Sequence, residues 1–407
     1  MTEKTNTPEL RFPEFREGWK EFILNDVSIK KSKKNKNNLY NETFTNSAEY
    51  GIVPQKDYFD KEISNVRNLS NYYIVDPDDF VYNPRISSLA PVGPINRNKL
   101  NRIGVMSPLY TVFSTKLSIK SFLEYYFKTT KWHKFMKLNG DSGARSDRFT
   151  IKQSLFVKMP IVLPSEQEQE KIGGFFSKLD RQIELEEKKL ELLEQQKKGY
   201  MQKIFSQELR FKDKKDNYYS DWKNCQLKDL TYYKNGKGYE KVATTNGKYN
   251  IINLNSIGIK GQLKDSGKYT DFEDDTLLKN DLIMILSDVA KGNLIGMTAI
   301  IDENNKYLLN QRIALLRIKN SLITNAYFLY LYINFNRKYF INMSAGMSQL
   351  NINKKTVEDF PVNLPNIEEQ NKIAILFKNY GDTIKKQASK VKLLKQRKQG
   401  LLQKMFV

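Results

Sequence analysis

The chain has 407 residues, an apolar fraction of 40%, 23 tyrosines and 23 phenylalanines, which suffices for two domains with hydrophobic cores and excludes a disordered protein. A single cysteine, Cys225, excludes an internal disulfide and makes the cytoplasm the expected location. Together with a single histidine, His133, it also excludes a Cys/His zinc site, and the lack of long apolar runs predicts that no segment spans a membrane. The net charge of +21 favours a polyanionic partner, most often nucleic acid, although a lysine-rich composition alone would also produce it.

Residues 1–164 are predicted to form a first α+β domain. Strand-like stretches occur at 71–75, 79–83 and 109–114, and a helical segment is expected near 118–138. Basic side chains in the predicted turns are candidate DNA contacts, because arginine and lysine bind phosphates and guanine. These candidates are Lys33, Lys34, Arg85, Arg97, Arg102, Arg145, Arg148 and Lys152. For each of them, taken singly, a solvated surface charge is the favoured interpretation over a base contact.

Residues 165–206 are predicted to form a first long helix. Pro160 and Pro164 precede it, and Ser165 stands three residues before Glu168, which is the spacing of a capping box. Residues 207–365 are then predicted to form a second α+β domain, with strands at 249–254, 281–286, 297–301 and 314–318 and a helix near 325–341.

The second domain has its own candidate DNA contacts, in which asparagine and glutamine can read adenine. They are Lys237, Lys241, Lys291, Asn293, Arg312, Gln349, Asn351 and Lys354. The glycine-containing loops 141–150 and 344–351 occupy equivalent places in the two domains and are the favoured contact regions.

Residues 366–407 are predicted to form a second long helix, because the chain repeats itself at a distance of 201 residues. Residues 160–205 and 361–406 align without a gap, and 18 of the 46 columns are identical. Glu9–Phe12 recurs as Glu208–Phe211, whereas the segments between these landmarks do not match. This organisation is typical of a protein whose two heads do related work on different targets.

Both long helices carry an apolar stripe with heptad spacing, and an antiparallel pair within the chain is the simplest way to bury both stripes. The first helix is rich in glutamate and the second in lysine, which favours the pairing of unlike helices. The predicted pairing positions are Ile183, Glu186, Leu190, Leu193 and Lys197 with Ile384, Gln387, Val391, Leu394 and Lys398. We prefer the register that places Glu186 opposite Lys398 and Lys197 opposite Gln387. The alternative is that each stripe packs onto its own domain.

The sequence offers little for catalysis. It has no G-x-x-x-x-G-K-[ST] loop, and the Asn83-Pro84-Arg85 segment lacks the second proline and the aromatic residue of an adenine methyltransferase motif, so we interpret it as a turn. We therefore expect no catalytic residue and no metal site in this chain, although a nuclease that uses carboxylates and a metal remains an alternative.

The duplicated order of motifs resembles the specificity subunits of type I restriction–modification systems. The order is Leu-Arg-Phe-Pro-x-Phe, a tryptophan and Leu-x-Asp, then a variable region, then Pro-x-x-Leu-Pro-x-x-x-Glu-Gln-x-Lys-Ile and a long helix. The residues on which the resemblance rests are Arg11–Phe15, Trp19, Pro160–Ile172 and Pro361–Ile373. The loop residues Arg145–Arg148 differ from their counterparts Met347–Leu350, so the two heads are expected to end differently.

The resemblance implies two α+β target-recognition domains related by pseudo-two-fold symmetry and separated by a long antiparallel two-helix coiled coil. It implies a non-catalytic subunit that reads a bipartite double-stranded DNA target, with the helices setting the spacer. Two methyltransferase subunits and two restriction/translocase subunits are expected as partners, and these would carry S-adenosylmethionine, ATP and Mg²⁺. A free-standing DNA-binding regulator without enzyme partners is the alternative function.

Overall fold

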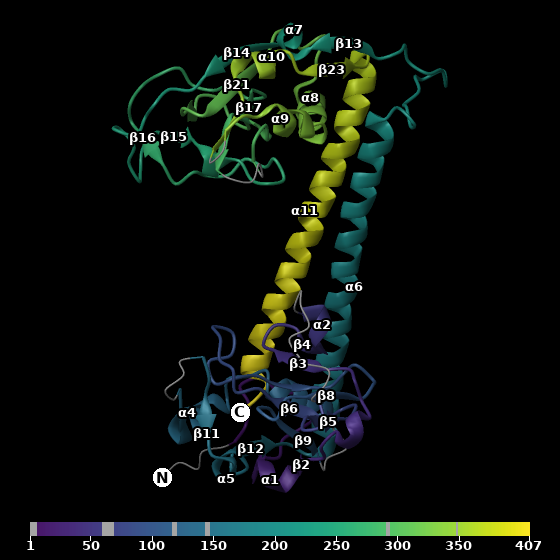
Figure 1. Cartoon of the computed structure of the whole chain (residues 1–407), viewed down its shortest axis with the longest axis vertical. Coiled ribbons are helices and arrows are strands. Elements are labelled where there is room, and N and C mark those ends of the chain that lie inside the picture. The colour runs from purple at the N-terminus through teal and green to yellow at the C-terminus, as the bar shows by residue number, and fades with distance from the viewer. Residues whose placement is uncertain (1–5, 59–68, 116–119, 143–146, 290–293, 347–348) are drawn as a thin grey trace. The chain divides into compact units, whose positions relative to one another are not determined.

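The computed structural model describes residues 6–58, 69–115, 120–142, 147–289, 294–346 and 349–407. The chain forms two compact units, and each contains parts of both halves of the sequence (Figure 1). The first unit comprises Met1–Lys188 and Ala388–Val407, and the second comprises Lys189–Gln387. The division falls inside the two long helices, so each helix contributes one half to each unit. Among the described residues, no helix has an apolar stretch that could cross a membrane.

The first unit is centred on a four-stranded antiparallel sheet in the order β2-β9-β6-β7, with β2 at Ser28–Lys31, β9 at Thr111–Thr115, β6 at Phe80–Tyr82 and β7 at Ile95–Arg97. Four two-stranded ladders surround it: β1 (Lys20–Ile23) with β12 (Pro160–Leu163), β3 (Phe44–Ser47) with β4 (Gly51–Pro54), β5 (Tyr73–Val75) with β8 (Gly104–Met106), and β10 (Gly140–Asp141) with β11 (Thr150–Ile151). Its short helices are α1 (Leu24–Val27), α2 (Gln55–Tyr58), α3 (Lys120–Tyr126), α4 (His133–Asn139) and α5 (Gln153–Phe156), with a 3₁₀ turn at Lys36–Asn38.

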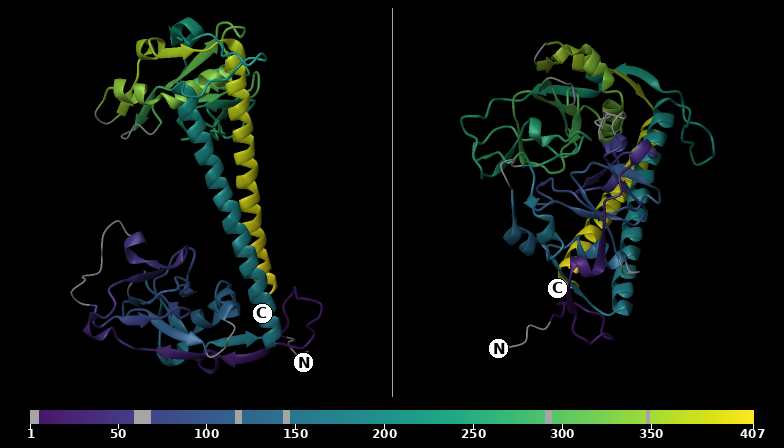
Figure 2. Two further views of the ribbon diagram at one scale, coloured as in Figure 1. Left: turned by 90° about the vertical axis from the view of Figure 1, so that its right-hand side faces the viewer. Right: turned by 60° about the horizontal axis from the view of Figure 1, so that its bottom comes forward.

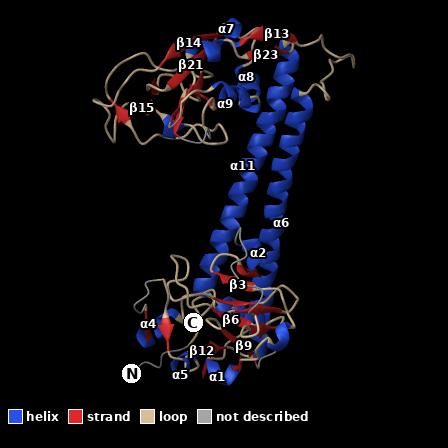
Figure 3. Cartoon of the chain, in the orientation of Figure 1, coloured by secondary structure: helices blue, strands red, loops and turns tan. Residues whose placement is uncertain are grey.

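The second unit has a four-stranded sheet of the same connectivity, in the order β14-β21-β17-β19, with β14 at Thr231–Asn235, β21 at Ile313–Ile318, β17 at Leu282–Ile285 and β19 at Thr298–Ile300. Its other ladders join β13 (Lys223–Gln226) to β23 (Pro361–Leu364), β18 (Ser287–Val289) to β22 (Gln349–Asn351), and β15 (Tyr249–Ile252) to both β16 (Tyr269–Thr270) and β20 (Tyr307–Leu309). Its short helices are α7 (Leu227–Leu230), α8 (Ala326–Phe335), α9 (Lys338–Met343) and α10 (Lys354–Glu358), with a 3₁₀ turn at Leu254–Ser256. The mixture of short strands and short helices in each unit, visible in Figure 3, confirms the α+β prediction.

The two sheets share a detail that their sequences do not reveal. Asp79 and Asp281 precede equivalent strands and are both buried. Each accepts a hydrogen bond from the backbone N–H three residues upstream, at 2.8 Å in both units. The residue just before each aspartate has a positive φ of 70°. The two units are therefore structural repeats, although their sequences align only at the connecting segments.

The long helices are α6 (Glu166–Phe205) and α11 (Ile367–Lys404), and both begin at a capping side chain. Ser165 Oγ accepts from the N–H of Glu168, and Asn366 Oδ1 accepts from the N–H groups of Glu368 and Glu369. In the first unit the beginning of α6 lies beside the end of α11, and in the second unit the end of α6 lies beside the beginning of α11 (Figure 2). The predicted antiparallel pairing is confirmed.

The end of each long helix completes the core of one unit. The ring of Phe406, just beyond α11, lies 5.1 Å from that of Phe122 on α3, and the ring of Phe205 at the end of α6 lies 6.0 Å from that of Phe328 on α8. Because Phe205 and Phe406 are equivalent in the repeat, the two cores are closed in the same way. Each core therefore requires a helix whose other half belongs to the other unit.

The register of the helix pair differs from the predicted one by several residues. Glu186 forms its ion pair with Lys390, at 2.6 Å, and Lys398 reaches Asp180 instead of Glu186. In the second unit the ring of Tyr200 lies 5.9 Å from that of Tyr380, four residues from its predicted neighbour Ile384. The physical reason is that the two polar residues of the stripes, Glu186 and Lys398, do not have to face each other. Each forms an ion pair with a different residue of the opposite helix, Lys390 and Asp180 respectively.

The predicted pairing positions vary in burial. Ile183, Gln387 and Val391 are buried, whereas Glu186, Leu190, Leu193, Lys197, Ile384, Leu394 and Lys398 are half-buried. Burial lowers the pKa of the Lys197 ammonium, since this side chain is enclosed where it crosses the apolar stripe.

Candidate nucleic-acid interface

In each unit a short antiparallel pairing follows a central strand of the four-stranded sheet, and we call it the terminal ladder. It is the Arg85–Arg148 bridge after β6 in the first unit and the β18–β22 pair after β17 in the second. In the first unit the Asn83 side chain accepts from the N–H of Arg85 at 2.9 Å, which makes the predicted turn an Asx turn. The N–H of Ile86 then donates to Asp147, and that of Phe149 donates to Pro84. This pairing places Arg85 directly opposite Arg148.

The side chains of this first terminal ladder are available to a partner. The Arg85 side chain is 61% exposed, and its nearest carboxylate oxygen, on Asp147, lies 3.9 Å from its Nε. Arg148 is half-buried. The turn brings two guanidinium-bearing residues together, which is a suitable arrangement for phosphates or guanine.

The second unit forms its terminal ladder from β18 and β22 at the equivalent place, after β17. The amide of Gln349 donates to the Ser287 hydroxyl, and Asn351 is paired with Ser287 along the strands. The carbonyl of Arg312 accepts from the N–H of Leu286, so Arg312 stands at the start of this ladder with a positive φ of 72°. This ladder presents amides together with one exposed guanidinium, whereas the first presents two arginines.

The structure engages several predicted contacts in ion pairs away from the terminal ladders. Arg102 binds both oxygens of Glu42, at 2.7 and 2.9 Å, and the bond with Arg102 holds the pKa of the Glu42 carboxyl below its usual range. Arg97 lies 2.9 Å from Glu124, and Lys237 bonds Asp274 at 2.5 Å. Lys354 lies 3.5 Å from Glu358 and faces the Tyr233 ring. A guanidinium whose N–H groups already bind a carboxylate has fewer donors left for DNA.

The remaining predicted contacts divide into two groups. The exposed lysines are Lys33, Lys34, Lys152 and Lys241, of which Lys34 donates to Asn71 at 3.3 Å. Arg145, Lys291 and Asn293 lie outside the described residues. His133 is half-buried against the Trp132 ring.

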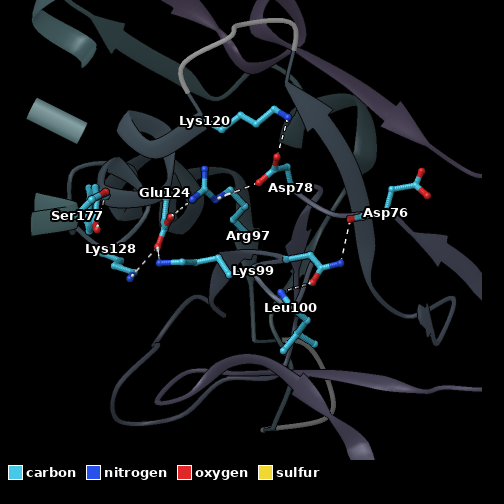
Figure 4. Close-up of polar contacts among 11 residues, drawn as sticks. Asp76, Asp78, Arg97, Lys99, Leu100, Lys120, Glu124, Lys128 and Ser177 are labelled. Atoms are coloured by element: carbon cyan, nitrogen blue, oxygen red, sulfur yellow. Dashed lines mark hydrogen bonds and ion pairs between the residues drawn. The ribbon is translucent and has the colours of Figure 1, made fainter. Parts of the chain in front are cut away.

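Sequence reasoning missed a buried carboxylate on α3. Glu124 is 3% exposed and binds three cations, Arg97 at 2.9 Å, Lys99 at 3.2 Å and Lys128 at 3.3 Å (Figure 4). An available signal was the position of this residue in Ser121–Phe127, where it is the one acidic side chain in an otherwise apolar and aromatic helix. Such a residue is rarely buried without a partner.

The second unit contains a carboxylate whose charge is strongly stabilised. The hydrogen bond from Lys237 is the main reason that the pKa of Asp274 falls from 3.8 to about 2, and the Tyr239 hydroxyl also donates to it. The carboxylate thus stabilises the fold at any pH above its unfolded pKa near 3.8, and this contribution is lost as the pH falls toward 2.

We therefore expect Asp274→Asn to reduce the stability of the second unit at pH 6, with a difference from the wild type that shrinks as the pH approaches 2.5. Urea unfolding across this pH range measures the effect. Glu273→Gln is the matched control, because Glu273 holds Lys248 in an exposed surface pair. A difference between Asp274→Asn and wild type that stays constant with pH contradicts the assignment.

Among the described residues, no three His, Cys, Asp or Glu side chains are grouped so that they could hold a metal ion. Burial shifts other groups, such as Tyr233, whose pKa it raises to about 12.

Comparison with known proteins agrees with the duplicated architecture. Residues 16–195 and 219–395 each match the family described as the type I restriction modification DNA specificity domain. The specificity subunit of the type I restriction enzyme MjaVIII from Methanocaldococcus jannaschii is 22% identical over 292 residues, which is 69% of this chain and 65% of that protein. The matched region thus spans slightly less than two thirds of the relative's length.

Two solved structures share the fold over nearly the whole chain. A type I restriction–modification system S subunit from M. genitalium has a TM-score of 0.57 at 14% identity and covers 98% of this chain and 99% of its own. A chain from a structural study of complex assembly and conformational transition of the type I restriction–modification system has a TM-score of 0.58 at 15% identity. That match covers 97% of this chain and 98% of the other. With the family match extending over both repeats, the chain belongs to the type I restriction–modification DNA specificity domain family.

Proposed function

We propose that the chain is the DNA sequence-recognition subunit of a type I restriction–modification complex and reads a bipartite target with its two heads. The observation that carries this proposal is the pair of equivalent terminal ladders with unlike side chains. Arg85 and Arg148 suit guanine or phosphate, whereas Gln349 and Asn351 suit adenine. The same scaffold with different reading groups is what recognition of two different half-sites requires.

The long helices are proposed to set the spacer between the half-sites. Both α6 and α11 pass from one unit into the other, and forty helical residues extend over about 60 Å. A helix pair resists bending more than a loop does, so it can hold a fixed separation.

The chain is proposed to be non-catalytic and to act as a scaffold for two methyltransferase and two restriction/translocase subunits. These partners would carry S-adenosylmethionine, ATP and Mg²⁺. Leu192 and Leu393 are equivalent in the repeat, and both are large apolar side chains that are exposed on the long helices. Two equivalent exposed leucines support two docking points for copies of one partner.

Co-expression with a type I methyltransferase subunit tests this proposal. We expect the two proteins to co-purify at a fixed ratio, and the complex to bind duplex DNA with an affinity that falls steeply with salt. Tight DNA binding by a chain that captures no methyltransferase would instead support the free-standing regulator, and Mg²⁺-dependent cleavage by the isolated chain would support a nuclease.

The double substitution Arg85→Ala with Arg148→Ala is expected to weaken binding of the complex to its DNA target by about tenfold or more, because each base-reading arginine contributes about 1–3 kcal/mol. Fluorescence anisotropy with labelled duplexes measures the loss. Substitutions within the second half-site should affect the double variant and the wild type equally. Arg102→Ala is the control, since Glu42 already occupies that guanidinium. Equal losses in both variants would show that these arginines contribute only general charge.

A further inference from the structure

A groove of about 650 Å³ opens in the first unit beside the sheet. It is bounded by the β3–β4 hairpin, the edge strand β7, the α3–α4 segment and the adjoining stretches of α6 and α11. This volume is in the range of small-molecule sites, about 300–1,000 Å³, and is far larger than one phosphate ion needs. The groove is separate from the terminal ladder of the same unit, because neither Arg85 nor Arg148 lines it.

The groove carries an excess of positive charge. Its cations are Arg97, Lys99, Lys128, Lys395 and Lys398, and its carboxylates are Glu49, Glu124 and Asp180. Glu124 is already shared by three of these cations, as Figure 4 shows. Arg97 also lies 3.8 Å from Asp78, which binds Lys120 as well. Two carboxylates shared among four cations do not neutralise them, so the wall of the groove retains charge that an anion would compensate.

The helix pair adds two lysines to this wall. Lys398 is paired with Asp180 and also lies over the Tyr125 ring, 5.6 Å from its centre. Lys395 reaches Glu187 and is more than half exposed. Burial lowers the pKa of the neighbouring Lys128 ammonium; the charge of Glu124 opposes this shift, and the charges of Lys398 and Lys99 add to it. An anion bound here would reverse that effect, because it favours the charged ammonium.

The groove also has the surfaces that a planar ring requires. Phe127, Trp132 and Leu402 contribute apolar lining. Tyr50 and Leu89 stand at its rim and are 64% and 68% exposed. An aromatic side chain next to clustered cations is the combination that binds a base together with its phosphates.

The equivalent positions of the second unit do not repeat this chemistry. Phe122 and Tyr126 on α3 correspond to Phe328 and Tyr332 on α8, since both pairs contact the phenylalanine that ends the incoming helix. This alignment places Tyr330 at the position of Glu124 and Asn334 at that of Lys128. Tyr330 donates to Gly261 and Asn334 binds the backbone of Thr298, so these side chains hold the fold instead. The carboxylate and the lysine that α3 and its following turn give to the groove are therefore not repeated at these two positions of the second unit.

We propose that this groove binds a free nucleotide, with its phosphates on the lysine-rich wall and its base against Tyr50. A nucleotide combines the two features that the lining offers, a compact polyanion and an apolar ring, within the available volume. The same chemistry could come from a nucleotide of a DNA strand, and the experiment separates the two sources.

The test is isothermal titration of the purified full-length chain with ATP, with tripolyphosphate and with adenosine. We expect ATP to bind at one site per chain, tripolyphosphate to bind more weakly because it lacks the ring, and adenosine to bind weakest because it lacks the phosphates. Lys99→Ala with Lys395→Ala should weaken ATP binding by about tenfold or more, as expected for two lost charged contacts. Tyr50→Ala should reduce the affinity for ATP but not for tripolyphosphate.

The control removes the same charge elsewhere through Lys214→Ala with Lys392→Ala, both of which are exposed and lie outside the groove. Thermal unfolding verifies that each variant is folded. Equal ATP affinities in the two double variants would show nonspecific attraction to a basic chain and overturn the proposal. Absence of ATP binding at millimolar concentration would overturn the proposal as well. If, in addition, a short single-stranded DNA binds tightly and loses affinity in the Lys99→Ala with Lys395→Ala variant, the groove is a site for a DNA strand and not for a free nucleotide.

Discussion

Replacing Arg210 with alanine is expected to lower the free energy of unfolding of the second unit by about 3–5 kcal/mol, because it leaves a buried carboxylate without its counter-charge. Glu369 is 0% exposed, and its oxygens accept from Arg210 Nε at 3.3 Å and Nη2 at 2.8 Å. The bond with Glu369 raises the pKa of the Arg210 guanidinium. Nη2 also donates to the carbonyl of Ser220 at 2.7 Å, so this arginine joins the entry segment of the head to the first turn of α11.

Hydrogen exchange followed by mass spectrometry measures this loss separately in each unit. The double variant Arg210→Leu with Glu369→Leu should recover part of the stability, since neither charge then remains buried. Lys214→Ala, an exposed substitution in the same segment, should change stability by about 0.5 kcal/mol or less. If Arg210→Ala is no more destabilising than this control, the ion pair does not hold the helix to the head.

The first unit has the same pair with one difference. Arg11 binds both oxygens of Glu168 at 2.7 Å. Trp222 donates to Glu369 at 3.1 Å, whereas the buried indole nitrogen of the equivalent Trp19 has no hydrogen-bond partner among the described residues. Glu168 therefore depends more completely on its arginine.

Phe406→Ala is expected to destabilise the first unit by about 3–5 kcal/mol, the usual result of truncating a buried phenylalanine. Its ring is almost fully enclosed and lies 5.1 Å from Phe122, 5.9 Å from Phe176 and 6.4 Å from Trp19. The last residues of the chain thus complete a core that the first residues begin.

Urea unfolding monitored by tryptophan fluorescence in a Trp222→Phe background reports on the first unit, because Trp19 and Trp132 then remain. Leu393→Ala on the exposed face of α11 is the matched control and should have little effect. An unfolding midpoint for Phe406→Ala equal to that of the control would mean that the first unit folds without the end of α11.

The sequence predicts the architecture well because the repeat supplies two copies of each signal. The proline, serine and glutamate at 164–168 mark the start of α6, and the heptad stripe predicts a paired helix. The register is not determined by such a stripe, since apolar side chains tolerate a shift of one heptad. It depends on Asp180, Tyr125 and Lys390, which lie off the stripe or on another element. The helical segment near 118–138 divides into α3 and α4, because the turn after Phe127 is held by Thr129.

The candidate contacts were harder to predict, because the availability of a basic side chain depends on partners distant in sequence. Arg97 and Arg102 look like Arg85 in the sequence, yet Glu124 and Glu42 engage them in the fold. The glycine-containing loops were recognisable as equivalent from their position alone. Which of their side chains contact DNA stays a prediction.

The central claim is that two heads read two half-sites and that the helix pair sets the distance between them. The most direct test inserts one heptad into α6 after Lys188 and one into α11 after Gln387, at the division between the units, so that both halves keep their pairing. Methylation is then mapped across the genome of cells that express this chain with its methyltransferase. Seven helical residues add about 10.5 Å, so the account predicts unchanged half-sites separated by a spacer longer by about 3 base pairs. Altered half-sites with an unchanged spacer would contradict it.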